Sequence, residues 1–370
     1  MKIGLAPHFY NLSLELQKLG VSQNILASET DLDGKIFQGI QVHKFNNLHP
    51  FEVIRSGSAA FNKIKELKCS LKEFDFDLIH YHNPGYFLLD KHKKELGVPL
   101  IQTIHASPTR IKKTMFSEFS FRNFKEGFYY TLFTRYGLKN CAATIVVANE
   151  EKQSLVNQWN ADKEKIFVIP TAVDLKDFKI EKKEKKEYDI IYAGRFAPGK
   201  RIPDLLKAVE ILKETFPDIK LLLVGGHKKD ISYRTVLNTI KSLRLEKNVI
   251  NTGIVSQSEL KKLFLKTKVY GLSSVQDGLP KSVLEAMACK LPVVAYGVAG
   301  LIDCVEDCKT GYLIQPKNIN ELMGKLKLLL ENEHLRKEFG VKALRKVEKE
   351  FNWKRVAQLN KKVYETVLRC

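Results

Sequence analysis

The chain has 370 residues, of which 44% are hydrophobic, and it carries a formal net charge of +19. This length exceeds that of one ordinary core and fits two domains. No run of about 18 uncharged apolar residues is present, and no apolar stretch follows the opening MKIGLAP, so we expect neither a membrane span nor a signal peptide. The six scattered cysteines lack paired metal-ligand spacing, which favours free thiols, no metal site and a reducing cytoplasm.

Short apolar runs alternate with amphipathic segments along the first half of the chain. This βα rhythm indicates a parallel sheet covered by helices, and therefore an α/β fold. The predicted strands of this half are KIGLA, NILA, DLIHY, PLIQTIH, ATIVVA and KIFVIP.

One window of the first half, residues 110–139, combines positive charge with aromatic rings. It holds seven basic and two acidic residues, and its net charge of +5 equals that of the whole of residues 1–172. It also holds nine aromatic side chains. Such a segment can lie on an anionic membrane surface, where each Lys or Arg contributes about 1 kcal/mol. The rings could equally fill the core of the first domain. Peripheral binding to the inner face of the cell membrane is therefore a hypothesis with an open alternative.

Residues 171–188 interrupt this rhythm with the charged run EKKEKKEYD and indicate a linker. A second series of strands then begins, which predicts two domains, residues 1–172 and 173–351. Open α/β sheets bind ligands at the carboxyl ends of their strands. A last helix, at about residues 352–370, shows apolar residues at helical spacing. The predicted strands of the second series are DIIYAG, KLLLVGG, KVYGLS, PVVAYG and GYLIQ.

The strand DIIYAG leads into the turn GRFAPGKR and then into an amphipathic helix from about Ile202. A basic, glycine-bearing turn at a helix N-terminus is a recurrent phosphate site. Arg195 offers a bidentate guanidinium and Lys200 a mobile point charge. The turn therefore predicts binding of an anion.

The segment SSVQDGLPKSVLEAMACKLP carries two carboxylates, Asp277 and Glu285, eight positions apart. Pro280 fits the start of a helix, so Asp277 lies in a turn and Glu285 falls one turn into the helix. Both can then face one pocket that suits a ligand with hydroxyls and phosphate, such as a sugar nucleotide. The alternative is a pair of solvated surface charges.

These segments resemble the retaining glycosyltransferases of family 4, which have the GT-B fold. The resemblance rests on GRFAPGKR, on the Asp277 to Glu285 segment with EAMACKLPVVA behind it, and on YGVAGLIDCVEDCKTGYLIQP. In the first half it rests on MKIGLA, DLIHYHN and IQTIHAS. It implies two Rossmann-like domains facing across a cleft, with the last helix packed back on the first domain.

The implied reaction moves a sugar from a GDP- or UDP-sugar to a hydroxyl of a glycan or lipid-linked acceptor, in polysaccharide or glycolipid biosynthesis. By residue matching, Arg195 and Lys200 would stabilise the leaving diphosphate and Glu285 would bind the donor ribose. His105, in IQTIHAS, would lie near the reacting sugar. Asp277 would contact hydroxyls of that sugar, and the backbone of Gly278 and Leu279 would complete its pocket.

The chain departs from the family pattern in three places. The first carboxylate is usually Glu but is Asp277 here, and the Gly-Gly loop expected near the first strand is absent from APHFYNLSLEL. Asp303 stands where Glu is common. No Asp-x-Asp motif accompanies the phosphate turn, and Lys and Arg can clamp a diphosphate without a metal. We therefore expect metal independence and no cofactor, the nucleotide-sugar being a substrate.

Two other classes of function stay open. A related two-domain enzyme, such as a nucleotide-sugar epimerase or a glucan phosphorylase, would share the architecture, and the phosphorylase would need a lysine-bound pyridoxal phosphate. A non-catalytic nucleic-acid-binding protein would explain the charge. Its basic residues are spread widely without a recognised nucleic-acid motif, which disfavours that alternative.

Overall fold

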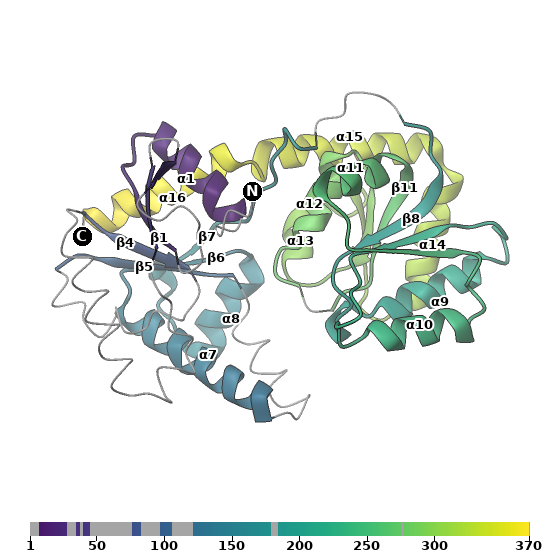
Figure 1. Ribbon diagram of the computed structural model, residues 1–370, viewed down its shortest axis with the longest axis horizontal. Coiled ribbons are helices and arrows are strands. Elements are labelled where there is room, and N and C mark those ends of the chain that lie inside the picture. Colours follow the sequence, from purple (N-terminus) through teal and green to yellow (C-terminus); the bar gives the residue numbers. More distant parts are fainter. Residues whose placement is uncertain are drawn as a thin grey trace. The chain divides into compact units, whose positions relative to one another are not determined.

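The structure is a computed structural model that describes residues 7–27, 35–37, 40–44, 76–82, 97–105, 121–178, 184–275 and 277–369. The chain divides into two compact units. Unit 1 comprises Met1–Pro170 with Trp353–Cys370, and unit 2 comprises Thr171–Asn352 (Figure 1). Each contains a parallel sheet with helices, which confirms the predicted α/β class.

Unit 1 contains a four-stranded parallel sheet in which sequential strands are neighbours: β4 (Ile79–His82), β5 (Leu100–Ile104), β6 (Ala143–Val146) and β7 (Ile166–Val168). All four were predicted as apolar runs. The predicted strand KIGLA lies outside the described residues. A smaller sheet has the order β1-β3-β2 and was predicted only in its first strand; it comprises β1 (Asn24–Ala27), β2 (Lys35–Phe37) and β3 (Ile40–Lys44).

Side chains alternate between the two faces along each strand of the larger sheet. One face is covered by α7 (Phe121–Asn140) and α8 (Asn149–Trp159). Gln102 of β5 points to this face, because a Cβ added to Gly137 of α7 would lie 2.3 Å from its Oε1. Residues 101, 103 and 105 therefore belong to the opposite face.

The opposite face receives the last helix, α16 (Trp353–Leu368), which also packs against α1 (Pro7–Lys18). Lys361 of α16 donates from Nζ to the carbonyl of Leu19 at 2.7 Å. The apolar spacing predicted for this helix is largely present, although Leu359 is only half-buried. The buried residues of α16 are Trp353, Val356, Ala357, Asn360, Val363, Tyr364 and Val367.

Unit 2 is built on a six-stranded parallel sheet in the order β10-β9-β8-β11-β12-β13. Five strands follow predicted apolar runs. The edge strand β10 was not predicted, because its sequence VINTG is only partly buried and lacks an apolar run. The strands are β8 (Tyr188–Ala193), β9 (Leu221–Val224), β10 (Val249–Gly253), β11 (Thr267–Leu272), β12 (Val293–Tyr296) and β13 (Gly311–Ile314).

Helices follow the strands of unit 2, and α9, α12 and α14 pack against the sheet, whereas α15 packs against α12 and α14 (Figure 1). The six largest fully buried side chains of the described structure are aromatic and all lie in unit 2. The helices are α9 (Ile202–Leu212), α10 (Tyr233–Ser242), α11 (Gln257–Leu265), α12 (Lys281–Ala288), α13 (Gly300–Cys304), α14 (Ile319–Glu331) and α15 (Glu333–Glu350).

The start of the predicted linker is packed rather than loose. Val173 forms a bridge with Asn352 and donates its N–H to the carbonyl of Phe351 at 3.0 Å. Phe178 is fully buried and lies against the ring of Phe264. Ala172, Val173 and Phe178 thus belong to the core of unit 2, whereas residues 176, 177 and 184–187 are exposed.

Candidate active site

Arg195 and Lys200 lie between β8 and α9, at the carboxyl end of a central strand. A single 3₁₀ turn, Pro198–Lys200, fills this connection, and Arg201 then adopts a left-handed conformation (φ 45°) where α9 begins. Arg195 itself is exposed, and its carbonyl accepts a hydrogen bond from the Tyr192 hydroxyl at 2.8 Å. The turn is thus held through its backbone, which leaves the Arg195 guanidinium in solvent.

Asp230 fixes the same turn to the loop after β9. Its Oδ2 accepts from the backbone N–H of Phe196 at 2.8 Å and from that of His227 at 3.1 Å. Although burial favours its protonated form, these N–H groups and the nearby charge of Arg195 hold the pKa of Asp230 below the ordinary value. Asp230 was not predicted from the sequence.

Glycines let the two loops approach each other. A Cβ on Gly226 would lie 2.4 Å from the Phe196 ring, and one on Gly225 would lie 2.8 Å from the carbonyl oxygen of Gly194. The Phe196 ring also stacks on Tyr233, with centroids 6.0 Å apart. Phe196 therefore packs beneath the turn, where a larger residue at position 226 would displace it.

Lys200 and Asp277, predicted to bind different parts of a donor, form an ion pair. Lys200 Nζ lies 2.5 Å from Asp277 Oδ1, and both side chains are mostly buried. The second oxygen, Asp277 Oδ2, is buried, and within the described part of the chain it accepts no hydrogen bond. A buried carboxylate oxygen without a donor is costly, so this atom is suited to a ligand hydroxyl.

Two serines after β11 tie the Asp277 segment to the Lys200 turn. Ser273 Oγ donates to the carbonyls of Lys200 and Arg201 at 3.2 and 2.8 Å, and Ser274 Oγ donates to that of Gly199 at 3.2 Å. These serines were not predicted, although two hydroxyl residues directly after an apolar strand are a visible signal in the sequence.

Arg201, the third basic residue of the turn, has a structural partner. It donates from Nε and Nη2 to both oxygens of buried Asp204 at 2.7 and 2.9 Å, and the Tyr296 hydroxyl donates to the same carboxylate at 2.9 Å. This bidentate pair lies at the start of α9 and occupies the guanidinium.

Gly278 and Leu279 form the turn that precedes α12, with Pro280 at the N-cap. Their backbone lies directly against α13, since a Cβ on Gly300 would be 2.0 Å from the carbonyl oxygen of Gly278 and 2.9 Å from Cα of Leu279. Gly300 is therefore required for the position of the turn. Gln276 lies outside the described residues.

Glu285 lies on α12, as predicted, and its side chain is buried. Its Oε1 is 3.4 Å from Nζ of Lys281, and burial is the main cause of its raised pKa. The Tyr270 hydroxyl bonds to Ser282 Oγ at 2.8 Å. Burial is the main cause of the raised pKa of Tyr270, and the charges of both Asp277 and Glu285 raise it further, which puts both carboxylates in the neighbourhood of this ring.

His105 belongs to unit 1, directly after β5, whereas the other candidate residues belong to unit 2. Its Nε2 lies 3.0 Å from Nδ1 of His82, and burial lowers the pKa of His105 to about 4. It is therefore neutral at pH 7. His82 and its neighbour His80 were not identified from the sequence.

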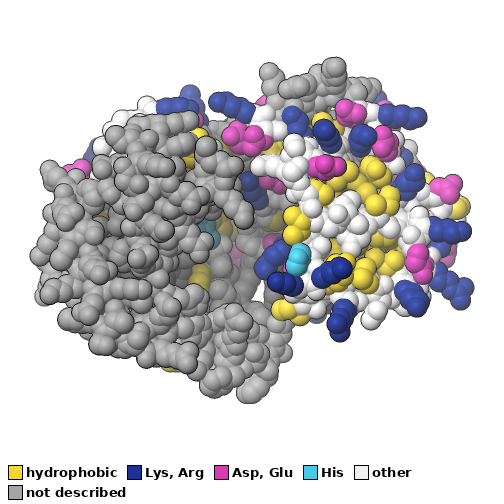
Figure 2. All heavy atoms as spheres, viewed as in Figure 1, with side chains coloured by type: hydrophobic (Ala, Val, Ile, Leu, Met, Phe, Trp, Pro, Cys, Tyr) yellow, Lys and Arg dark blue, Asp and Glu magenta, His cyan; other side chains and the backbone are white. Residues whose placement is uncertain are grey.

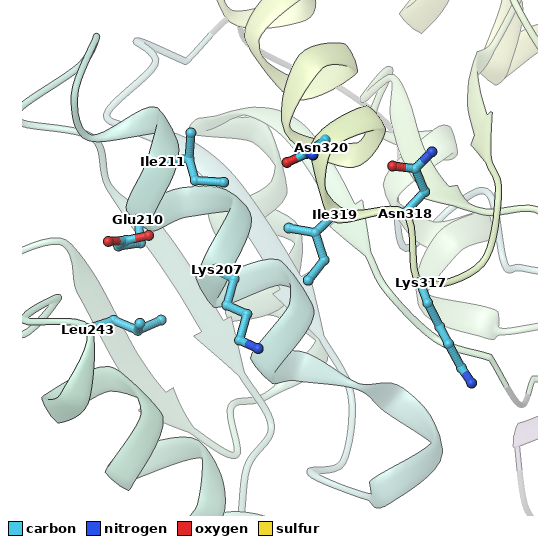
Figure 3. A pocket seen from close by; sticks show the side chains of 8 residues that line it. All are labelled: Lys207, Glu210, Ile211, Leu243, Lys317, Asn318, Ile319 and Asn320. Atoms are coloured by element: carbon cyan, nitrogen blue, oxygen red, sulfur yellow. The ribbon is translucent and has the colours of Figure 1, made fainter.

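A pocket of about 540 Å³ lies on unit 2, away from the candidate residues, none of which lines it (Figure 3). The residues around this pocket are Lys207, Glu210, Ile211, Leu243, Lys317, Asn318, Ile319 and Asn320.

The described surface carries charges of both signs. On the face drawn in Figure 2, Lys and Arg side chains are distributed among Asp and Glu. No helix in the described ranges is both long and apolar enough to cross a membrane.

Two family models match adjoining parts of the chain. Residues 3–177 match the model described as glycosyltransferase family 4, and residues 173–346 match the model described as glycosyl transferases group 1. Together the two models cover residues 3–346, which lie in both units.

Several known proteins are similar to the chain. An uncharacterized glycosyltransferase of Methanocaldococcus jannaschii, MJ1178, is 27% identical over 98% of this chain and 94% of its own length. A poly(ribitol-phosphate) alpha-N-acetylglucosaminyltransferase of Staphylococcus aureus is 32% identical over 54% of this chain, and the match spans 39% of that longer protein. The structure of Anabaena HepE in complex with UDP superposes with a TM-score of 0.74 at 17% identity, covering 99% of this chain and 97% of that one.

Proposed function

Since the chain belongs to glycosyltransferase family 4 and has the GT-B fold, we propose that it transfers a sugar, with retention of anomeric configuration, from a nucleotide donor to a hydroxyl group. The observation that carries this proposal is the Lys200–Asp277 pair at the carboxyl ends of β8 and β11. A cation suited to a diphosphate lies beside a carboxylate suited to sugar hydroxyls.

In the proposed complex, the donor diphosphate replaces Asp277 as the partner of Lys200, and Arg195 binds a further phosphate oxygen. When the bond to the sugar breaks, negative charge grows on the leaving phosphate. Cations already in position stabilise that charge without reorganisation, which is the largest contribution that such a site makes to catalysis.

The exchange leaves both oxygens of Asp277 able to accept hydroxyl groups of the transferred sugar. Oδ2 is already buried without a donor from the described residues. The backbone of Gly278 and Leu279, packed against Gly300, forms the adjacent wall. Sugar binding would thereby satisfy an acceptor to which none of the described residues donates.

Glu285 is assigned to the ribose of the donor. Two neighbouring ribose hydroxyls can donate to one carboxylate and favour its ionised form, which opposes the effect of burial. Lys281 supports the same charge state from 3.4 Å. His105, on unit 1, is assigned to the reacting sugar by the family resemblance.

The donor proposed first is a UDP-sugar, because the Anabaena structure contains UDP and the Staphylococcus relative is named for transfer of N-acetylglucosamine. The acceptor is proposed to be a hydroxyl of a glycan or lipid-linked sugar. We also propose that Lys200 and Arg195 take the place of a metal. Activity that EDTA abolishes and magnesium restores would contradict that part.

The test is a thermal shift and turnover assay with UDP-glucose, UDP-N-acetylglucosamine and GDP-mannose. At about 100 times its dissociation constant, a bound donor stabilises the folded state by about 2.7 kcal/mol. The shift should be lost in Lys200→Ala and Glu285→Ala but kept in Lys207→Ala, which removes an equal charge from the exposed side of α9. A shift that persists in both site variants would overturn the assignment.

Peripheral membrane binding is proposed through α7. Phe128, Leu132 and Tyr136 are 51%, 47% and 37% exposed at four-residue spacing, which forms one stripe. Phe133 is buried, so the described side chains of α7 include both buried and exposed rings. Binding should require anionic vesicles and decrease when Phe128 and Leu132 are both changed to Ser. Equal binding to neutral vesicles would argue against the proposal.

A further inference from the structure

Three histidines form a stack on one face of the sheet of unit 1. His80 and His82 alternate with Tyr81 along β4, so both point to the face opposite α7, and β5 brings Thr103 and His105 to the same face. The centroids of His80 and His82 are 4.3 Å apart, and those of His82 and His105 are 5.3 Å apart with nearly parallel rings.

The stack is anchored at His80, whose two ring nitrogens both have partners. Nδ1 lies 2.7 Å from the Tyr364 hydroxyl of α16, and Nε2 lies 2.7 Å from Thr103 Oγ1. These two contacts fix the plane of the His80 ring. Burial lowers the pKa of His80 to about 3 and raises that of Tyr364, so both groups are neutral around pH 7.

The contact between His82 Nδ1 and His105 Nε2 links the tautomers of the two rings. A hydrogen bond at 3.0 Å needs a proton on one nitrogen and a lone pair on the other. If His82 donates, the proton of neutral His105 is on Nδ1; if His105 donates, its Nδ1 carries the lone pair. The partner of one ring nitrogen thus determines which of the two nitrogens carries the proton.

We propose that His82 is a positioning residue that holds His105 in one orientation and one tautomer, on a platform formed by His80 and Tyr364. A histidine beside a reacting sugar must present a defined donor or acceptor, and rotation of the ring or exchange of tautomers would remove it. The consequence for catalysis rests on the proposed function, whereas the contact itself can be tested without substrate.

The experiment compares His82→Leu with His82→Asn by ¹⁵N NMR of the histidine side chains and by steady-state kinetics. Leu keeps an apolar side chain without a hydrogen bond, and the Asn amide lies close to the position of Nδ1 and can donate or accept. In the unmodified protein, the ¹⁵N shifts of His105 should correspond to a single tautomer. In His82→Leu they should move towards the values of mixed tautomers, and kcat should fall about tenfold with little change in donor KM.

His82→Asn should restore both the ¹⁵N pattern and most of kcat. His334→Asn, an exposed position on α15, is the control and should change neither. Unchanged His105 shifts in His82→Leu would overturn the proposal. Failure of Asn to restore them would also contradict it, because ring packing would then be the whole effect. If no sugar nucleotide is turned over by the unmodified protein, the proposed function fails while the NMR comparison still decides the contact.

Tyr364→Phe tests the platform, because it removes only the hydroxyl that bonds to His80. It should broaden the ¹⁵N signals of His80 and produce a smaller change at His105 than His82→Leu does. A change at His105 as large as that of His82→Leu would contradict the order of contacts described above.

Discussion

The two sets of candidate residues, one in each unit, are held in place in opposite ways. In unit 2 the loops are fixed through their backbone, by Asp230 and by the hydroxyls of Ser273 and Ser274. This leaves the charged ends of Arg195 and Lys200 able to change partners. In unit 1 the rings are fixed through their own polar atoms, from Tyr364 through His80 to Thr103.

This contrast follows from the task proposed for each set. A charge that binds a diphosphate must leave its resting partner. Lys200 can do so without becoming a buried, unpaired charge, because the incoming phosphate would replace Asp277. A neutral ring that presents one nitrogen gains from immobility, because each additional orientation dilutes the productive one. Substitutions in unit 2 should therefore change how strongly the charged donor is bound. Those in unit 1 should change how firmly a histidine ring is held in one orientation.

The largest effect is expected in unit 2, where the candidate residues are charged. Lys200→Ala should lower kcat/KM for the donor by about 10²- to 10³-fold, because a cation aimed at the leaving phosphate is removed. Steady-state kinetics with the best donor measures this loss, and Lys207→Ala should stay near the unmodified value. A fall of less than about fivefold would mean that Arg195 carries the leaving-group charge alone.

The next largest effect tests whether packing between backbone segments of unit 2 holds the candidate site in position. Gly300→Ala puts a Cβ 2.0 Å from the carbonyl oxygen of Gly278, so the turn must shift. We expect a loss of stability of about 1–3 kcal/mol in thermal unfolding, together with loss of donor binding. Gly324→Ala is the matched control. Its Cβ would meet nothing within 4 Å in α14, so it should be neutral or stabilising by up to about 1 kcal/mol.

Removing the charge of Asp277 should have opposite effects on the binding of UDP and on sugar transfer, because Lys200 exchanges partners in the proposed complex. Asp277→Asn removes the charge that holds Lys200, so UDP alone should bind roughly two- to fivefold more tightly. Sugar transfer should nevertheless fall, since the acceptor of the sugar hydroxyls is weakened. Calorimetry with UDP, beside kinetics with the UDP-sugar, separates the two effects. Weaker binding of UDP would show that Asp277 supports the diphosphate instead.

The smallest expected effect concerns stability and pH. The pKa of Glu285 is raised in the folded protein above its ordinary value of 4.5, so the folded state binds a proton more readily than the unfolded state. Its contribution to stability is therefore fully present below pH 4.5 and is lost as pH rises through the folded pKa. Glu285→Gln should therefore raise Tm at pH 7, and the gain should shrink towards pH 4. A constant difference across this range would exclude ionisation as the cause.

Much of the fold was predictable because its strands are buried on both faces. Runs such as DIIYA and PVVAY carry their own signal, since parallel strands covered by helices need continuous apolar residues. The strand β10 was missed because an edge strand has no such requirement. The packed state of Ala172, Val173 and Phe178 was missed because charged residues follow directly, and the run was taken as one linker.

The candidate residues of unit 2 were identified from the sequence because glycine turns, basic residues and spaced carboxylates occur in short segments. The residues that hold these candidates in position, Asp230 and Gly300, were not identified, because they are remote in sequence from the atoms they contact. The histidine stack was missed for the same reason. His80 and His82 were visible as alternating positions of a strand, but Tyr364 lies 284 positions from His80.

By itself the sequence determined the α/β class, the second series of strands and the chemical types gathered at the loop ends, because these depend on local patterns of apolar and turn residues. Only the tertiary structure decided that Lys200 is paired with Asp277, that Gly300 supports the Gly278 turn, and that three histidines stack on the sheet of unit 1. Such contacts join distant segments, and their geometry is set by how strands and helices pack rather than by any one segment.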